Sequence, residues 1–327
     1  MVVAIASVLP PFTLARAFTA WTAAPGVLAG VGLTGGGYLG ALRRRDGPWP
    51  RARTLAFLGG LVSVLLVTVT FVGVYAGTLF WDRALQNVVL LTVTPMLLAL
   101  GAPVSLLRDV LPAALRARLG AARRSRVAHL LTFPVVVTLL LVAPLPVLYL
   151  TPLYEATLRS GWVAVLAGLG LLVCGFGYFW TRLRLDPTPR TDPYMVTVAI
   201  TLVEVVADGA LGLALWLGPL IAPAYYAELA RGWGPSVRVD QIIGAGVLWI
   251  GGDIAGLPFL GAVLMRMARE SEREAAVIDA ELDAADAAAA AHATASGHDE
   301  AAADARPQLW WELDPELAMR IRRDNGG

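Results

Sequence analysis

The residues best suited to chemistry are acids that stand inside long apolar stretches. Glu204 and Asp208 lie four positions apart, so on a helix they share one face, and Asp253 occupies the middle of a later stretch. Charged groups at such depth usually face a protein interior, a polar partner or water. Two neighbouring carboxylates resist simultaneous ionisation, so they would hold a proton or bind a cation. A protonated acid that only hydrogen-bonds a neighbouring helix is the structural alternative, and the sequence leaves both open.

A second polar group begins another apolar stretch. Arg83, Gln86 and Asn87 are spaced so that a helix places them on one face. They form either a polar cluster near the membrane surface or simply the solvated start of a helix.

Recognisable metal and catalytic motifs are lacking in the sequence. The three histidines stand at a stretch boundary and in the C-terminal tail: His129, His292 and His298. Cys174, Met96 and Met195 are soft enough to bind Cu(I), yet such residues more often serve packing. Because no Ser-His-Asp, Walker or HExxH arrangement occurs, we predict that the protein is not an enzyme.

Seven apolar stretches must position these residues. Each is about twenty residues or longer, which is enough to cross the hydrocarbon core of a bilayer as a helix. The chain is 57% hydrophobic and only 16% charged, with a mean hydropathy of +0.64. The sequence therefore predicts an all-α polytopic membrane protein, a bundle of seven transmembrane helices. The predicted spans are 22–42, 54–76, 84–107, 130–151, 161–181, 194–219 and 241–265.

Arginine placement predicts the orientation of the chain, which contains no lysine. Connectors 43–53, 108–129 and 182–193 together carry fourteen arginines, whereas the opposite side carries five. Because positive charge accumulates in cytoplasmic loops, the N-terminus is expected outside and the C-terminus in the cytoplasm. The net charge of +1 gives no reason to expect nucleic acid as a partner; the lipid bilayer is the expected environment.

Composition divides the chain into three parts. Residues 1–18 are expected to be an outer N-terminal segment, 19–267 the seven-span membrane domain, and 268–327 a cytoplasmic tail. The tail is rich in alanine and acidic residues, so it is expected to be partly disordered. Within the membrane domain, Gly32, Gly36 and Gly40 repeat every four residues, a spacing typical of close helix packing. The same packing role is expected of further glycines in two spans: Gly26, Gly30, Gly244, Gly251, Gly252 and Gly256.

Several strings, in order and spacing, resemble the CtaG-like family of cytochrome c oxidase assembly factors. They are WPRARTLAFLGGL (49–61), LLTVTPMLLALGAPVSLL (90–107), LYLTPLYEATLRSGWV (148–163), YFW (178–180), LIAPAYYAEL (220–229) and VDQIIGAGVLWIGGDI (239–254). The resemblance runs from about residue 18 to 267. It implies a multi-pass protein of the bacterial plasma membrane, with haem-copper oxidase subunits as partners and copper as the associated metal.

The resemblance also implies histidines at positions where this chain has none. The family pattern places them where the sequence has Arg83, Asn87, Tyr149, Ala164 and Gly168, and before Pro134, where Phe133 stands. Imidazole is a copper ligand, whereas alanine, glycine and phenylalanine are not. The expected function is therefore oxidase assembly or maturation, through copper-centre biogenesis or as a scaffold. The alternatives are a proton- or ion-coupled transporter that uses the midplane acids, and an accessory subunit of a respiratory complex.

Overall fold

The computed structural model describes residues 9–183 and 194–295, apart from a few side chains within the helices. Every regular element in these two ranges is a helix, so the prediction of an all-α protein is confirmed. The chain forms two compact units, Met1–Gly261 and Ala262–Gly327.

Helices coincide with all seven predicted spans. They are α3 (Pro25–Arg44), α4 (Arg51–Val69), α6 to α7 (Phe80–Leu100), α11 with α12 (Pro134–Val142 and Pro144–Tyr149), α14 (Gly161–Leu183), α15 (Tyr194–Leu217) and the first part of α17 (Val237–Ala295). Among the described residues, three helices are long and apolar enough to cross a membrane: α4, the helix Phe80–Leu100, and α14.

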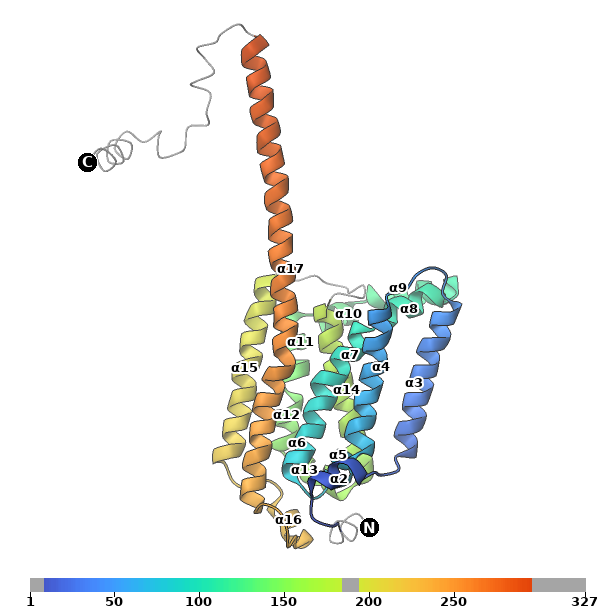
Figure 1. Ribbon diagram of the computed structural model, residues 1–327, viewed down its shortest axis with the longest axis vertical. Coiled ribbons are helices and arrows are strands. Elements are labelled where there is room, and N and C mark those ends of the chain that lie inside the picture. The colour runs from blue at the N-terminus through green and yellow to red at the C-terminus, as the bar shows by residue number, and fades with distance from the viewer. Residues whose placement is uncertain (1–8, 184–193, 296–327) are drawn as a thin grey trace, which may run out of the picture. The chain divides into compact units, whose positions relative to one another are not determined.

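Short helices gather at the two ends of the first unit (Figure 1). One end, called the α13 end below, carries α2 (Leu14–Thr19), α5 (Phe71–Tyr75), α13 (Leu153–Arg159) and α16 (Pro223–Leu229). The opposite end carries α8 (Pro103–Val110), α9 (Ala113–Arg123) and α10 (Arg126–Leu131). The basic connector 108–129 thus contains one helix of its own, α9, between two others.

Proline interrupts two of the predicted spans. In the third span, α6 (Phe80–Val88) passes through a π-helical turn, Val89–Val93, into α7 (Thr94–Leu100). Pro95 has no N–H, and just before it the Thr94 N–H donates to the Val89 carbonyl, five residues back. Pro144 similarly separates α11 from α12 in the fourth span. The sequence predicted these spans as single stretches and did not predict the interruptions.

Close approach between helices explains several glycines, but not the glycines of α3 that repeat every four residues. Gly26, Gly30, Gly32, Gly36 and Gly40 have nothing within 4 Å of the position that a Cβ would occupy. The expectation that they pack against a neighbour is therefore wrong within the described chain.

Glycines of the later spans do lie against neighbours. A Cβ on Gly244 would strike the Phe80 ring, and one on Gly251 would lie 3.3 Å from Val88. Gly252 lies beside the Asp208 carboxylate, and a Cβ there would be 2.6 Å from Oδ2. The packing prediction is confirmed for these three, whereas the side-chain surroundings of Gly256 lie outside the described residues.

Two glycines of α14 provide a matched test of this packing. A Cβ on Gly175 would meet the Leu91 carbonyl oxygen and lie 2.7 Å from Pro95, whereas one on Gly170 would meet nothing within 4 Å. We expect Gly175→Ala to lower the free energy of unfolding by about 1–3 kcal/mol, because backbone cannot yield. Gly170→Ala should leave it unchanged or raise it by up to about 1 kcal/mol through helix propensity. Thermal unfolding of the purified variants measures both, and equal behaviour would contradict the packing.

Candidate functional site

The polar residues of the α13 end are organised around the start of α6. Leu79 precedes this helix and offers no capping side chain, so the first N–H groups lack a local partner. Asp240, in the first turn of α17, supplies it: Phe80 N–H donates to Oδ2 and Trp81 N–H to Oδ1, both at 3.1 Å. The Asp240 side chain is 1% exposed, and Arg231 Nη2 lies 3.2 Å from Oδ2. A buried carboxylate thus caps a helix from a distant part of the chain.

The residues flanking Asp240 secure a second helix. Arg238 donates to the carbonyls of Gly218, at 2.5 Å, and of Trp216. Gln241 Nε2 donates to the Leu215 carbonyl at 2.7 Å. These carbonyls belong to the end of α15 and the chain just beyond it, where helical partners are missing. The first turn of α17 therefore joins the start of α6 to the end of α15.

One turn into α6, a hydrogen-bonded chain crosses to other helices. Arg83 Nη1 donates to Gln86 Oε1 at 2.9 Å, and Nη2 donates to the Thr157 carbonyl of α13 at 3.4 Å. Gln86 Nε2 in turn donates to the Val67 carbonyl of α4 at 2.7 Å. Asn87 Nδ2 donates to the Tyr149 hydroxyl of α12 at 2.9 Å. The sequence alternative of a merely solvated helix start is wrong, because Gln86 and Asn87 are buried.

Buried aromatic rings surround this network. The rings of Tyr149 and Tyr154 stack at a centroid distance of 4.9 Å, and Phe80 lies against both. The hydroxyls of Tyr154 and Tyr226 are 2.8 Å apart, which links α13 to α16. Burial raises the pKa of both these tyrosines, so they remain neutral hydrogen-bonding groups.

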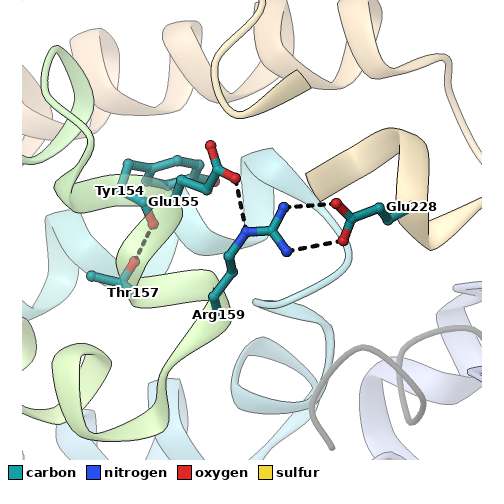
Figure 2. A network of polar contacts seen from close by, with 5 residues as sticks. All are labelled: Tyr154, Glu155, Thr157, Arg159 and Glu228. Atoms are coloured by element: carbon teal, nitrogen blue, oxygen red, sulfur yellow. Dashed lines mark hydrogen bonds and ion pairs between the residues drawn. The ribbon is translucent and has the colours of Figure 1, made fainter. Parts of the chain in front are cut away.

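An exposed ion-pair network joins the same two helices at the surface (Figure 2). Arg159 Nη1 and Nη2 make a two-pronged contact with Glu228, each at 2.9 Å, and Nε donates to Glu155 at 2.8 Å. The hydrogen bonds from Arg159 hold the pKa of Glu228 below its usual range. Because all three side chains are partly exposed, this network fixes the geometry of α13 and α16 more than it stabilises the fold.

Asp82 is a residue that sequence reasoning missed. It is fully buried in the first turn of α6, and neither carboxylate oxygen accepts a hydrogen bond from the described residues. Asp240 and Arg83 are the charged groups that act on it. An acid in the first turn of a helix is ordinary in a sequence, so no pattern distinguishes this one from a solvated residue.

The predicted midplane acids lie elsewhere, Glu204 and Asp208 on α15 and Asp253 on α17. The Tyr178 hydroxyl donates to Glu204 Oε2 at 2.9 Å, and Glu204 is 7% exposed. The guanidinium of Arg182 lies 6.0 Å from the centre of the Tyr178 ring. Asp208 lies beside Gly252, whereas the side chain of Asp253 is outside the described residues. The grouping of all three acids stays a prediction, but Glu204 does face protein.

The positions at which the resemblance implies histidines come together only in part. Arg83 and Asn87 lie one turn apart on α6, and Asn87 contacts Tyr149. Gly168 of α14 lies deeper, with Leu90 3.6 Å from the position of its missing Cβ; Ala164 lies one turn before it. Within the described residues, no three His, Cys, Asp or Glu side chains are grouped closely enough to hold a metal ion.

Comparison with known proteins finds one family and several relatives. The family model of the cytochrome c oxidase caa3 assembly factor matches residues 37–270. Proteins of Mycobacterium bovis and Mycobacterium tuberculosis, both named only as uncharacterized, are 29% identical over 286 residues. A Mycobacterium leprae protein is 26% identical over the same length. Each match covers 84% of this chain but 43% of the relative, so the chain spans less than half of their length. No solved structure matches it.

The two buried acids of the α13 end should respond oppositely to substitution. Asp240→Ala leaves two helix N–H groups and Arg231 without their partner, so we expect a loss of about 3 kcal/mol in the free energy of unfolding. Asp82→Asn removes an ionisable acid that is buried without a hydrogen bond from the described residues, so we expect a gain of about 1 kcal/mol. Thermal unfolding of the detergent-purified chain measures both changes.

Asp109 supplies the control for this pair. It forms an exposed ion pair with Arg45 at 2.8 Å, so Asp109→Ala should cost less than about 1 kcal/mol. A loss in Asp82→Asn as large as that in Asp240→Ala would contradict the different roles assigned to the two acids.

Proposed function

The chain belongs to the family of cytochrome c oxidase caa3 assembly factors, and we propose that it assists oxidase assembly as a membrane scaffold without carrying copper itself. The observation that supports this role is the network formed by Arg83, Gln86, Asn87 and Tyr149. Three of its residues, Arg83, Asn87 and Tyr149, stand at positions where the family resemblance implies imidazole ligands. The proposed partners are the subunits of a haem-copper oxidase.

The chemistry of these side chains favours a scaffold over a copper carrier. Arg83 is a permanent cation that repels Cu(I) and cannot lose its charge at physiological pH. Asn87 and Tyr149 are engaged with each other, and amide and phenol groups are poor ligands for a soft ion. Polar contacts within the protein have thus taken the place of metal ligation, and they make this end of the bundle rigid.

The functional test compares assembly with copper supply. Deletion of the gene should remove assembled oxidase from native membranes, and added copper in the growth medium should not restore it, because the missing contribution is structural. Blue-native electrophoresis with oxidase subunits as markers measures assembly. The intact protein should co-purify with those subunits, and the Cys174→Ser variant should restore assembly fully.

Copper analysis of the purified chain is the second test of the scaffold role. We expect substoichiometric Cu(I) in the intact protein and no change in Cys174→Ser. Stoichiometric copper that Cys174→Ser removes, or recovery of oxidase on copper addition alone, would overturn the scaffold role and indicate copper delivery.

For the arrangement in the membrane, we propose seven spans, with the α13 end outside and the α9 end in the cytoplasm of a bacterial plasma membrane. The distribution of arginine supports this orientation, since fourteen fall in connectors of the α9 side against five on the other. Arg45 and Arg53 each lie about 5 Å from the centre of the Trp49 ring, a pairing common where helices leave the bilayer.

Reporter fusions test this orientation directly. A cytoplasm-active reporter fused after residue 267 should be active, and a periplasm-active reporter there should be silent, because an odd number of spans separates the two ends. At the N-terminus, the periplasm-active reporter should be active and the cytoplasm-active reporter should be silent. Periplasmic activity after residue 267 would contradict both the span count and the orientation.

A further inference from the structure

The second compact unit begins inside α17, which continues as a helix from Ala262 to Ala295. Along this part, small and apolar residues recur at alternating steps of four and three. They are Leu264, Ala268, Ser271, Ala275, Ile278, Leu282 and Ala285. This is the spacing of the contact stripe in a coiled coil.

The whole stripe is exposed. Ile278 is 56% exposed and Leu282 58%, and the alanines and the serine between Leu264 and Ala285 are exposed as well. Helices in proteins owe most of their stability to burial of such a face, because intrinsic helix propensity is weak. Within the described residues this stripe is therefore an interaction surface without a partner, and it is called the α17 stripe below.

Charge on either side of the α17 stripe restricts what can cover it. From residue 272 onward the described side chains that flank the stripe are acidic where they are charged: Glu272, Asp279, Glu281 and Asp286. The arginines of this segment whose side chains are described, Arg269 and Arg273, fall on the outer side of the helix by the same spacing. Arg269 lies one turn from Glu272 and offsets that acid in part, whereas no arginine lies within one turn of Asp279, Glu281 or Asp286.

These acidic flanks disfavour two occupants. Flanking positions of one helix meet flanking positions of the other in both parallel and antiparallel pairs, so two copies of α17 would bring like charges together. An anionic lipid surface would likewise be repelled by the acids. A partner helix with positive charges at its flanking positions would instead be attracted to these acids.

We propose that the α17 stripe binds a basic amphipathic helix of another protein, one with bulky apolar residues between flanks of lysine or arginine. Four of the seven stripe residues are alanine or serine, so large side chains are needed on the partner to fill the contact. This inference is independent of the scaffold role in oxidase assembly, because it rests only on the helix beyond Gly261.

The experiment uses the full chain in lipid nanodiscs and a synthetic peptide probe. The peptide has four heptads with leucine at the two core positions and lysine at the flanking positions; a second peptide carries glutamate instead of lysine. Fluorescence anisotropy should show binding of the lysine peptide, weakening as salt is raised, and none of the glutamate peptide. Empty nanodiscs report any binding of the peptide to lipid.

Matched variants locate the binding on the stripe. Ile278→Asn and Leu282→Asn should each weaken the lysine peptide by about tenfold or more, because they remove the largest contacts of the stripe. Val277→Asn should have no effect, since Val277 is equally exposed at 58% but lies off the stripe. The combined substitutions Glu272→Lys, Asp279→Lys, Glu281→Lys and Asp286→Lys should transfer binding to the glutamate peptide, whereas Asp283→Lys alone should not.

Other occupants would overturn the proposal. In a Cys174→Ser background, Ile278→Cys should not form disulfide-linked dimers on mild oxidation; efficient dimers would assign the stripe to a second copy. A cross-link between Ile278→Cys and Leu313→Cys in the same chain would assign it to the protein's own tail. Equal binding of both peptides, or binding unchanged in Ile278→Asn, would also refute the proposal.

Discussion

The capping of α6 by Asp240 is the constraint on which the α13 end depends. A helix that starts inside a protein must find partners for its first N–H groups, and nothing near Phe80 in the sequence provides them. The partner comes from a residue about 160 positions later. Since the same turn of α17 binds the end of α15 through Arg238 and Gln241, one short segment fixes how three helices meet.

This junction determines where the side chains of the next turn of α6 lie. With its start held, α6 directs Arg83 toward α13 and Asn87 toward α12, while Gln86 contacts α4. The stacked rings of Tyr149 and Tyr154 exclude water around these contacts, and hydrogen bonds are worth more in such surroundings. Four helices thus share one polar network, which suits the scaffold role proposed for this chain.

Apolar length and helix-spaced acids were readable from the sequence, and each predicted span contains helix. The interruptions at Pro95 and Pro144 were not, because a proline in a membrane span can be accommodated in several ways. Burial of Glu204 followed from the cost of a charge within an apolar stretch. The roles of Asp82 and Asp240 could not be predicted, since both look like ordinary acids near helix starts. Only the contact between α6 and α17 shows that Asp240 has hydrogen-bond partners, whereas Asp82 has none among the described residues.

Gly32, Gly36 and Gly40 of α3 show a further limit of pattern reading. Their spacing is correct for close packing, yet the described chain leaves them open, and α3 is attached by other residues. Tyr38 stacks on Phe57 at a centroid distance of 3.9 Å and donates to the Gly101 carbonyl at 2.8 Å. A four-residue spacing indicates that a close approach is possible but does not name the neighbour. The α17 stripe differs in this respect, because its charged flanks restrict which partner can bind. Complementary charge contributes to the specificity of an interface, and the charged residues can be read from a single sequence.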